Sequence, residues 1–91
     1  MRLEATEIYS DAANQAVMRH PGRRFPGVLV QGDTLYSLCR TADLACVAAK
    51  PTLNQDDFGH LNGLRNHLWS LLNHYKSVLQ EHDIKLPFYE I

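Results

Sequence analysis

The segment PGRRFPGVLVQGDTL, residues 21–35, decides the fold, because a loop, a strand and the start of a helix follow one another within it. Its prolines and glycines mark places where the chain turns or approaches another group closely. The apolar run at residues 28–30 predicts a strand buried on both faces, in the centre of a sheet or beneath a helix. Gly32 ends this strand, and Asp33 or Thr34 caps the helix that follows. The chain therefore changes from β structure to helical structure here.

Two further strands are expected before this segment. Residues 2–9 predict one strand, in which Leu3, Ile8 and Tyr9 are the apolar anchors. Residues 15–20 fit a second strand, although the alanine and glutamine in this region also favour a helix. We prefer the strand, because it pairs with the first as a hairpin and a single strand cannot hold a sheet.

Residues 34–49 predict an amphipathic helix that Pro51 ends. Its expected apolar stripe consists of Leu35, Leu38, Ala42, Ala45 and Ala49. Cys39 and Cys46 are seven residues apart in this helix, about 10 Å along its axis, which is too far for a disulfide between them. We interpret both as small buried thiols, which suits a reducing cytoplasm.

A second, longer helix is expected from the N-cap Asn54 to about His82. Its apolar residues recur with the steps of three and four that are typical of heptads: Leu61, Leu64, Leu68, Leu71, Tyr75 and Val78. Gly59 and Gly63 are expected to permit a close crossing with the alanine-rich end of the first helix. The apolar face is larger than a short helix and a small sheet readily cover, which indicates a homodimer. Its expected interface includes Leu61, Leu68, Trp69, Leu72 and Tyr75.

Length and charge exclude several classes of protein. With 91 residues the chain forms one domain with a small core, which we divide into a β-rich part at 1–31, a helical hairpin at 33–83 and an apolar tail at 84–91. The net charge of −1 argues against a nucleic-acid partner. A signal-peptide pattern and a membrane-spanning apolar run are both missing, so we expect a cytoplasmic protein that binds no membrane.

A cluster of basic residues is the candidate binding site of the loop. It consists of Arg19, His20, Arg23 and Arg24, and the sequence has no acidic residue between Asp11 and Asp33. Arginine side chains and glycine amides bind phosphate and carboxylate groups, so the cluster predicts a site for an anion or an acidic partner. The alternative is that these arginines pair with Glu4, Glu7 or acids of the helices, or are solvated.

Metal binding and catalysis have little support in the sequence. His60, His67 and His74 recur every seven residues, which places neighbours about 10 Å apart, so one helix cannot chelate a metal with them. We therefore expect no metal and no cofactor. A nucleophile beside a base, or a pair of carboxylates, is also not recognisable, and we expect no enzymatic activity.

Residues 21–35 resemble a family of short bacterial proteins of unknown function, and so does the ending from His74-Tyr75 to Leu86-Pro87. This resemblance implies a bacterial origin and brings no activity or catalytic residue. The junction at residues 30–35 is also similar to HicB-type antitoxins, in which a strand ending in Gly-Asp-Thr or Gly-Asp-Ser runs directly into a helix.

The expected fold is α+β, a small antiparallel sheet of two or three strands packed on a two-helix hairpin. The expected function is a non-enzymatic interaction with another protein in a bacterial cell, of the immunity, antitoxin or anti-defence kind. The alternative is a protein that binds a small anionic ligand or a nucleotide with Arg23 and Arg24.

Overall fold

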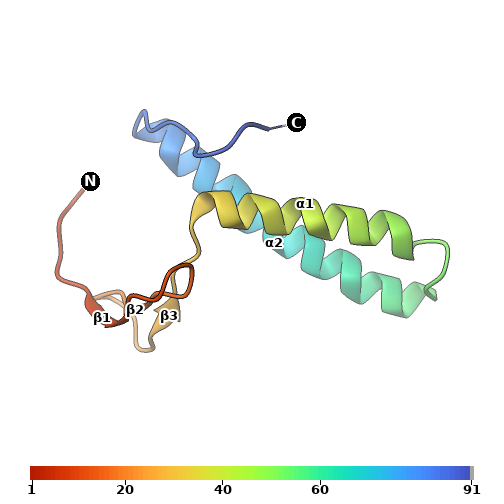
Figure 1. Cartoon of the computed structure of the whole chain (residues 1–91), viewed down its shortest axis with the longest axis horizontal. Coiled ribbons are helices and arrows are strands. Elements are labelled where there is room, and N and C mark those ends of the chain that lie inside the picture. The colour runs from red at the N-terminus through yellow and green to blue at the C-terminus, as the bar shows by residue number, and fades with distance from the viewer. Residues whose placement is uncertain (91) are drawn as a thin grey trace. The chain divides into compact units, whose positions relative to one another are not determined.

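The computed structural model describes residues 1–90, and its contacts divide the chain into two compact units, Met1–Gln31 and the segment that begins at Gly32. The elements are β1 (Glu7–Ser10), β2 (Val17–Arg19), β3 (Gly27–Val28), α1 (Gly32–Ala49) and α2 (Gln55–Glu81) (Figure 1). The predicted α+β class, with a small antiparallel sheet and two helices, is confirmed. Ile91, the last residue of the predicted tail, lies outside the described residues.

The sheet has the strand order β1-β2-β3, and both pairs of strands are antiparallel. Arg19 of β2 pairs with Glu7, and Met18 pairs with Ile8 on one side and with Gly27 on the other. The central strand β2 lies within residues 15–20, for which the sequence allows either a strand or a helix. The strand interpretation is confirmed.

The apolar run at residues 28–30 does not form a buried strand, and that prediction is wrong. β3 ends at Val28 and lies at an edge of the sheet, where the side chains of Val28 and Leu29 are 63% and 49% exposed. Within the unit Met1–Gln31 no helix or second sheet covers the faces of the sheet, so the apolar side chains of this run stay open. β1 is likewise shorter than the strand expected over residues 2–9, because β2 has no strand residue beyond Arg19 to pair with it.

Helix α1 begins at Gly32, earlier than expected, and ends at Ala49, just before Pro51. Asp33 and Thr34 therefore belong to its first turn and do not precede it as caps. The Oδ1 atom of Asp33 accepts a hydrogen bond from the backbone N–H of Thr34 at 2.9 Å. Negative charge in a first turn is favoured by the helix dipole, which accounts for an aspartate at this position.

Both ends of α2 agree with the sequence. The Oδ1 atom of Asn54 accepts a hydrogen bond from the backbone N–H of Asp57 at 2.8 Å, so Asn54 is the predicted N-cap. The helix ends at Glu81 with His82 as its C-cap. Asp83 follows with a φ of 55°, a left-handed conformation that aspartate tolerates better than most residues.

The two helices run side by side as a hairpin (Figure 1) and pack along a line of small residues on α1. The buried residues are Gly32, Cys39, Ala42 and Cys46 on α1 and Leu72 on α2. Leu38 and Ala45, two members of the predicted stripe, are exposed, and the cysteine that follows each of them is buried instead. The stripe prediction is wrong at these two positions. Small side chains at a helix contact allow a closer approach, so the line of small residues faces α2 and the line with Leu38 and Ala45 does not. Both thiols are free and buried, as predicted.

One glycine of the helices is required by a close contact. A Cβ atom at Gly32 would overlap the ring of Tyr75 on α2. At Gly59 and Gly63 a Cβ atom would meet nothing within 4 Å, so the close crossing predicted for them is wrong. Both lie on exposed parts of α2, whereas Gly32 lies between the helices.

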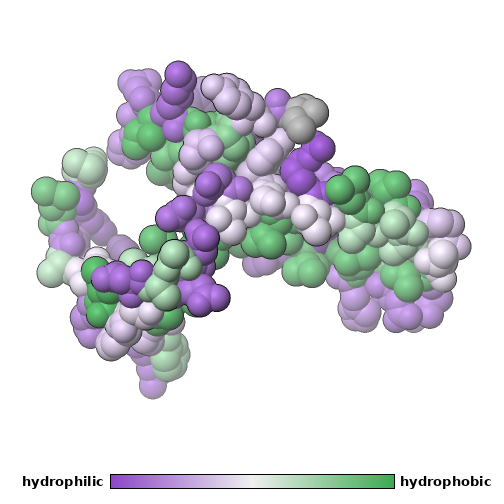
Figure 2. Space-filling model, in the orientation of Figure 1, coloured by the Kyte–Doolittle hydropathy of each residue, from purple (hydrophilic) through white to green (hydrophobic). Residues whose placement is uncertain are grey.

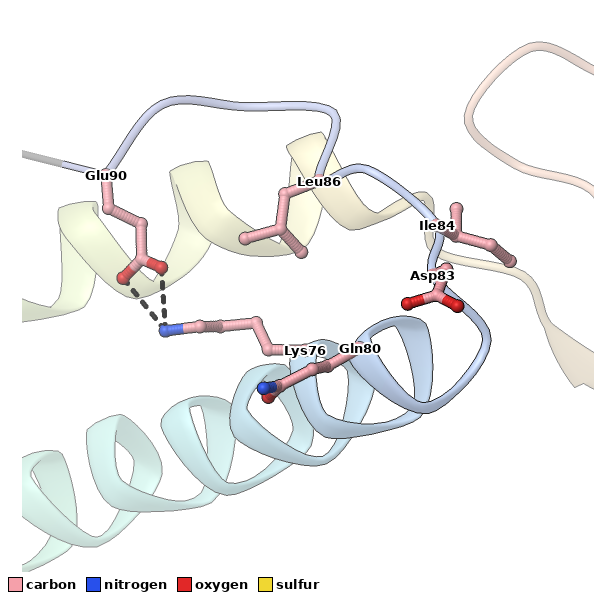
Figure 3. A pocket seen from close by; sticks show the side chains of 6 residues that line it. All are labelled: Lys76, Gln80, Asp83, Ile84, Leu86 and Glu90. Carbon is pink, nitrogen blue, oxygen red and sulfur yellow. Dashed lines mark hydrogen bonds and ion pairs between the residues drawn. The ribbon is translucent and has the colours of Figure 1, made fainter.

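The tail after α2 folds back onto the helices. The ring of Phe88 stacks on Tyr36 of α1, with centroids 4.3 Å apart and planes 4° from parallel. Lys76 of α2 forms an ion pair with Glu90 at 2.8 Å (Figure 3). The apolar tail is thereby fastened at both helices, which explains its composition.

Candidate functional site

A polar cluster joins the two helices in the middle of the hairpin. The Oδ1 atom of Asp43 on α1 accepts hydrogen bonds from Nε of Arg65 at 2.6 Å and from Nε1 of Trp69 at 2.9 Å. The side chains of Asp43 and Arg65 are 32% and 38% exposed. Because the two donors lie one turn apart on α2, the cluster fixes the level of α2 against α1.

The electrostatics of this cluster favour pairing and not proton transfer. Burial by itself would raise the pKa of Asp43, but the hydrogen bonds from Arg65 and Trp69 and the charges of Arg65 and Arg40 outweigh burial and lower the pKa below its usual value. Burial first, and then the charge of Asp43, raise the pKa of the Cys39 thiol. At neutral pH the carboxylate therefore stays ionised and the thiol stays protonated, the opposite of what a general base or a nucleophile needs.

Two hollows flank the helices. One, of about 180 Å³, lies between α1 and α2 and is lined by Asp43 and Arg65 together with Val47, Lys50 and Phe58. The other, of about 440 Å³, lies between the end of α2 and the returning tail (Figure 3). In the second hollow Lys76 and Glu90 pair with each other, and this ion pair holds the tail against α2.

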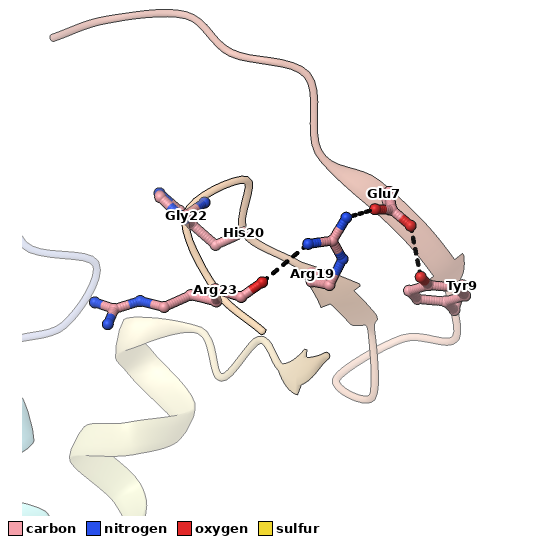
Figure 4. A network of polar contacts seen from close by, with 6 residues as sticks. All are labelled: Glu7, Tyr9, Arg19, His20, Gly22 and Arg23. Carbon is pink, nitrogen blue, oxygen red and sulfur yellow. Dashed lines mark hydrogen bonds and ion pairs between the residues drawn. The ribbon is translucent and has the colours of Figure 1, made fainter. Parts of the chain in front are cut away.

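Arg19 is bound within the sheet unit (Figure 4). Its Nη2 atom pairs with Oε1 of Glu7, and its Nη1 atom donates a hydrogen bond to the backbone carbonyl of Arg23 at 2.9 Å. Glu7 also accepts a hydrogen bond from the hydroxyl of Tyr9 at 2.6 Å. Arg19 thus joins β1, β2 and the loop, which is the structural alternative that the sequence left open for it.

Of the remaining members of the predicted basic cluster, His20 makes a hydrogen bond within the loop, whereas Arg23 and Arg24 are exposed. His20 accepts a hydrogen bond from the backbone N–H of Gly22 at 3.1 Å and so closes the turn. Arg24 lies over the ring of Phe25, 5.3 Å from its centroid, and the guanidinium of Arg23 extends away from the network in Figure 4. Among residues 1–90 neither Arg23 nor Arg24 has an ion-pair partner, and both are exposed.

One side of the hairpin has a single charged residue, Asp57, which lies at its end. The hollow lined by Val47 and Lys50 lies on the other side of the hairpin. Because successive residues of a helix are rotated by about 100°, Leu38 and Ala45 of α1 lie on the side away from this hollow, and so does Leu64 of α2. We call the rest of this side the uncharged face. It consists of Leu38, Thr41, Ala45 and Ala48 from α1 and of Leu61, Leu64, Leu68 and Leu71 from α2.

The uncharged face is apolar and open. Leu38, Leu64 and Leu71 are 45%, 56% and 48% exposed, and the space-filling view shows that hydrophobic residues lie on the surface of the hairpin (Figure 2). The α1 half presents mainly small side chains, and the α2 half presents only leucines. Around its edge lie His60, His67 and His74, each exposed. Asp57, one turn before Leu61, interacts with the amide of Asn54 at 3.1 Å.

The residues predicted as an interface are distributed between the inside of the hairpin and this face. Leu72 is fully buried, Trp69 bonds to Asp43, and Tyr75 packs against Gly32. Leu61 and Leu68 are half-buried members of the uncharged face. Sequence reasoning placed Leu64 and Leu71 in the apolar stripe but not in the interface. The line of small residues on α1 is the sequence feature that indicates which side of this helix faces α2.

Within residues 1–90, no three His, Cys, Asp or Glu side chains are grouped closely enough to hold a metal ion. Neither of the helices in this part of the chain has the length and apolar character needed to cross a membrane.

A family model described as "Family of unknown function (DUF6959)" covers residues 1–88. No curated protein and no solved structure matches the chain.

Proposed function

The chain belongs to the family of unknown function DUF6959, and we propose that it is a non-enzymatic protein-interaction module whose binding surface is the uncharged face of the helical hairpin. The observation that carries this proposal is the exposure of Leu38, Leu64 and Leu71 together on one side of two packed helices. Contiguous apolar surface of this kind marks interaction sites in soluble proteins. The proposal includes a protein of the immunity, antitoxin or anti-defence kind in a bacterial cell.

A catalytic role for the hairpin has weaker support. Asp43 is the partly buried acid between the helices, and both of its hydrogen bonds come from residues that keep it ionised. Leucine side chains in water gain about 1.5–3 kcal/mol each on complete burial, so binding is the use that this surface favours.

A photo-crosslinking residue at Leu71 tests the proposal. In cells that carry the natural protein, the Leu71 probe should form one discrete protein adduct, because this side chain lies in the proposed surface. The matched control is a probe at Val47, which is 75% exposed on the side of the hollow and should form no such adduct. Equal labelling from both positions, or none from Leu71, would contradict the proposal.

Anion binding by Arg23 and Arg24 is the second candidate, supported by two exposed guanidinium groups that have no ion-pair partner within residues 1–90. A thermal-shift series with inorganic phosphate and nucleotides should raise the melting temperature of the natural protein, since a ligand that binds the folded state stabilises it. The variant Arg23→Ala/Arg24→Ala should lose this response and keep its own melting temperature. An equal response of both proteins would refute this site.

A further inference from the structure

We infer that the uncharged face binds the same face of a second copy of this chain, so that two hairpins form a bundle of four helices. This inference rests on the proposed function and adds the identity of the partner. Two properties of the face, its charge and its shape, support the inference, and its size sets the expected strength of the dimer.

A twofold axis places the face against itself, so every charge on it would meet its own copy or a close neighbour. None of the eight residues of the face is charged, and the acids and bases of α1, Asp33, Arg40 and Asp43, lie on the other side of that helix. Asp57 of α2 lies on the same side but beyond Leu61, at the end of the face, where it is exposed. Self-association therefore buries no unpaired charge, which is the costly event in apolar interfaces. A strongly charged partner would find no complementary group on this surface.

The shape of the face allows two copies of it to pack together. The bonds from Asp43 to Arg65 and Trp69 place residue 43 level with residues 65–69, so Ala45 is level with Leu64 and, by the antiparallel course of the helices, Leu38 with Leu71. A twofold axis parallel to the helices superposes α1 of one copy on α2 of the other. Each leucine of α2 then faces a residue of α1 at the same level, and Ala45 leaves room for Leu64.

The size of the face suits a weak dimer. The face spans residues 38–48 of α1 and 61–71 of α2, so two packed helices about 17 Å long and 20 Å wide give a face of roughly 330 Å² in projection. Accessible area exceeds projected area, but small stable interfaces bury about 600 Å² per partner. The face is therefore smaller than a stable interface, and we expect a weak dimer that forms only at the upper concentrations of a sedimentation experiment.

Sedimentation equilibrium of the purified full chain, over micromolar to near-millimolar concentrations, tests the inference. The natural protein should sediment with twice the chain mass of 10.4 kDa at the upper concentrations. Leu64→Gln/Leu71→Gln should raise the dissociation constant at least about 100-fold, since two buried leucines per copy are lost. The control Leu44→Gln/Val47→Gln changes side chains that are 67% and 75% exposed elsewhere on α1 and should leave the constant unchanged.

A disulfide test gives the register without relying on affinity. Chains carrying Ala45→Cys are mixed with chains carrying Leu64→Cys and oxidised, and a covalent dimer of the two chains should form because the new thiols face each other across the axis. Val47→Cys mixed with Leu64→Cys should form none. Equal yields in both mixtures would overturn the arrangement.

A natural protein that remains monomeric at every concentration overturns the dimer, as does a dimer that Leu64→Gln/Leu71→Gln leaves intact. The proposed function is judged separately by the mass of the Leu71 crosslink. An adduct with a different protein supports the interaction module and overturns the dimer, and an adduct of two identical chains supports both.

Discussion

Replacing Gly32 by alanine should destabilise the hairpin, although alanine is a better helix former than glycine. A Cβ atom at this first residue of α1 would overlap the ring carbon Cζ and the hydroxyl of Tyr75, which is half-buried against it. Extra volume in a packed contact costs about 1–3 kcal/mol. The gain in helix propensity, at most about 1 kcal/mol, is small at a helix end. The free energy of unfolding should therefore fall by about 1–2 kcal/mol.

The measurement is urea unfolding followed by the helical signal of circular dichroism, at one protein concentration. The matched control is Gly59→Ala in α2, where a Cβ atom meets nothing within 4 Å. This control should raise the free energy of unfolding by about 0.5–1 kcal/mol, because only the propensity changes. In thermal unfolding, each 1 kcal/mol corresponds to roughly 4–8 °C for a chain of this size. The two glycine variants should thus shift in opposite directions.

A double-mutant cycle shows whether Tyr75 is the cause. In a Tyr75→Ala background the overlap is gone, so adding Gly32→Ala should become neutral or stabilising. Neighbouring residues that share a contact show such non-additivity. The reasoning is refuted if Gly32→Ala stabilises the natural protein as Gly59→Ala does, or if its cost is the same in both backgrounds.

Three further changes test other contacts. Asn54→Ala should lower the free energy of unfolding by about 1 kcal/mol in urea titrations, whereas Asn54→Ser, which keeps a capping oxygen and adds no charge beside Asp57, should lower it much less. Phe88→Ala should cost about 1 kcal/mol and increase proteolysis of the tail, because the stack on Tyr36 is lost; Phe88→Tyr, which keeps the ring, should change neither. The pKa of Asp43 is lowered on folding, so its contribution to stability is complete above the unfolded pKa of about 3.9 and is lost as pH falls through the lower folded value. Stability curves of Asp43→Asn should accordingly fall less steeply in acid than those of the natural protein, and parallel curves would contradict this.

The features that the sequence predicted well are local ones. Asn54 as N-cap, Pro51 as the end of α1 and the end of α2 near His82 each depend on the chemistry of a few neighbouring residues. β2 was also identified, because its neighbours in the chain allow a hairpin. Local backbone chemistry decides such features before any tertiary contact forms.

The features that failed depend on partners distant in sequence. The run at residues 28–30 has the composition of a buried strand, but its place at the edge of the sheet is set by strand order. Gly32 was interpreted as the end of a strand, since nothing in its vicinity announces Tyr75, 43 positions later. For Arg19 the sequence leaves open both a binding site and a pair with Glu7, and the choice depends on Glu7, which lies across the sheet.

The phase of α1 connects stability with function in this chain. Gly32, Cys39 and Cys46 are spaced by seven, and their small size draws α2 against this line. Turning α1 by one residue would bury Leu38 and Ala45 instead and would remove half of the uncharged face. In the observed phase Leu64 and Leu71 lie on the flank of α2 beside Leu38 and Ala45, and all four side chains remain exposed. The same choice of small residues that closes the hairpin therefore leaves the apolar surface on which the proposed interaction depends.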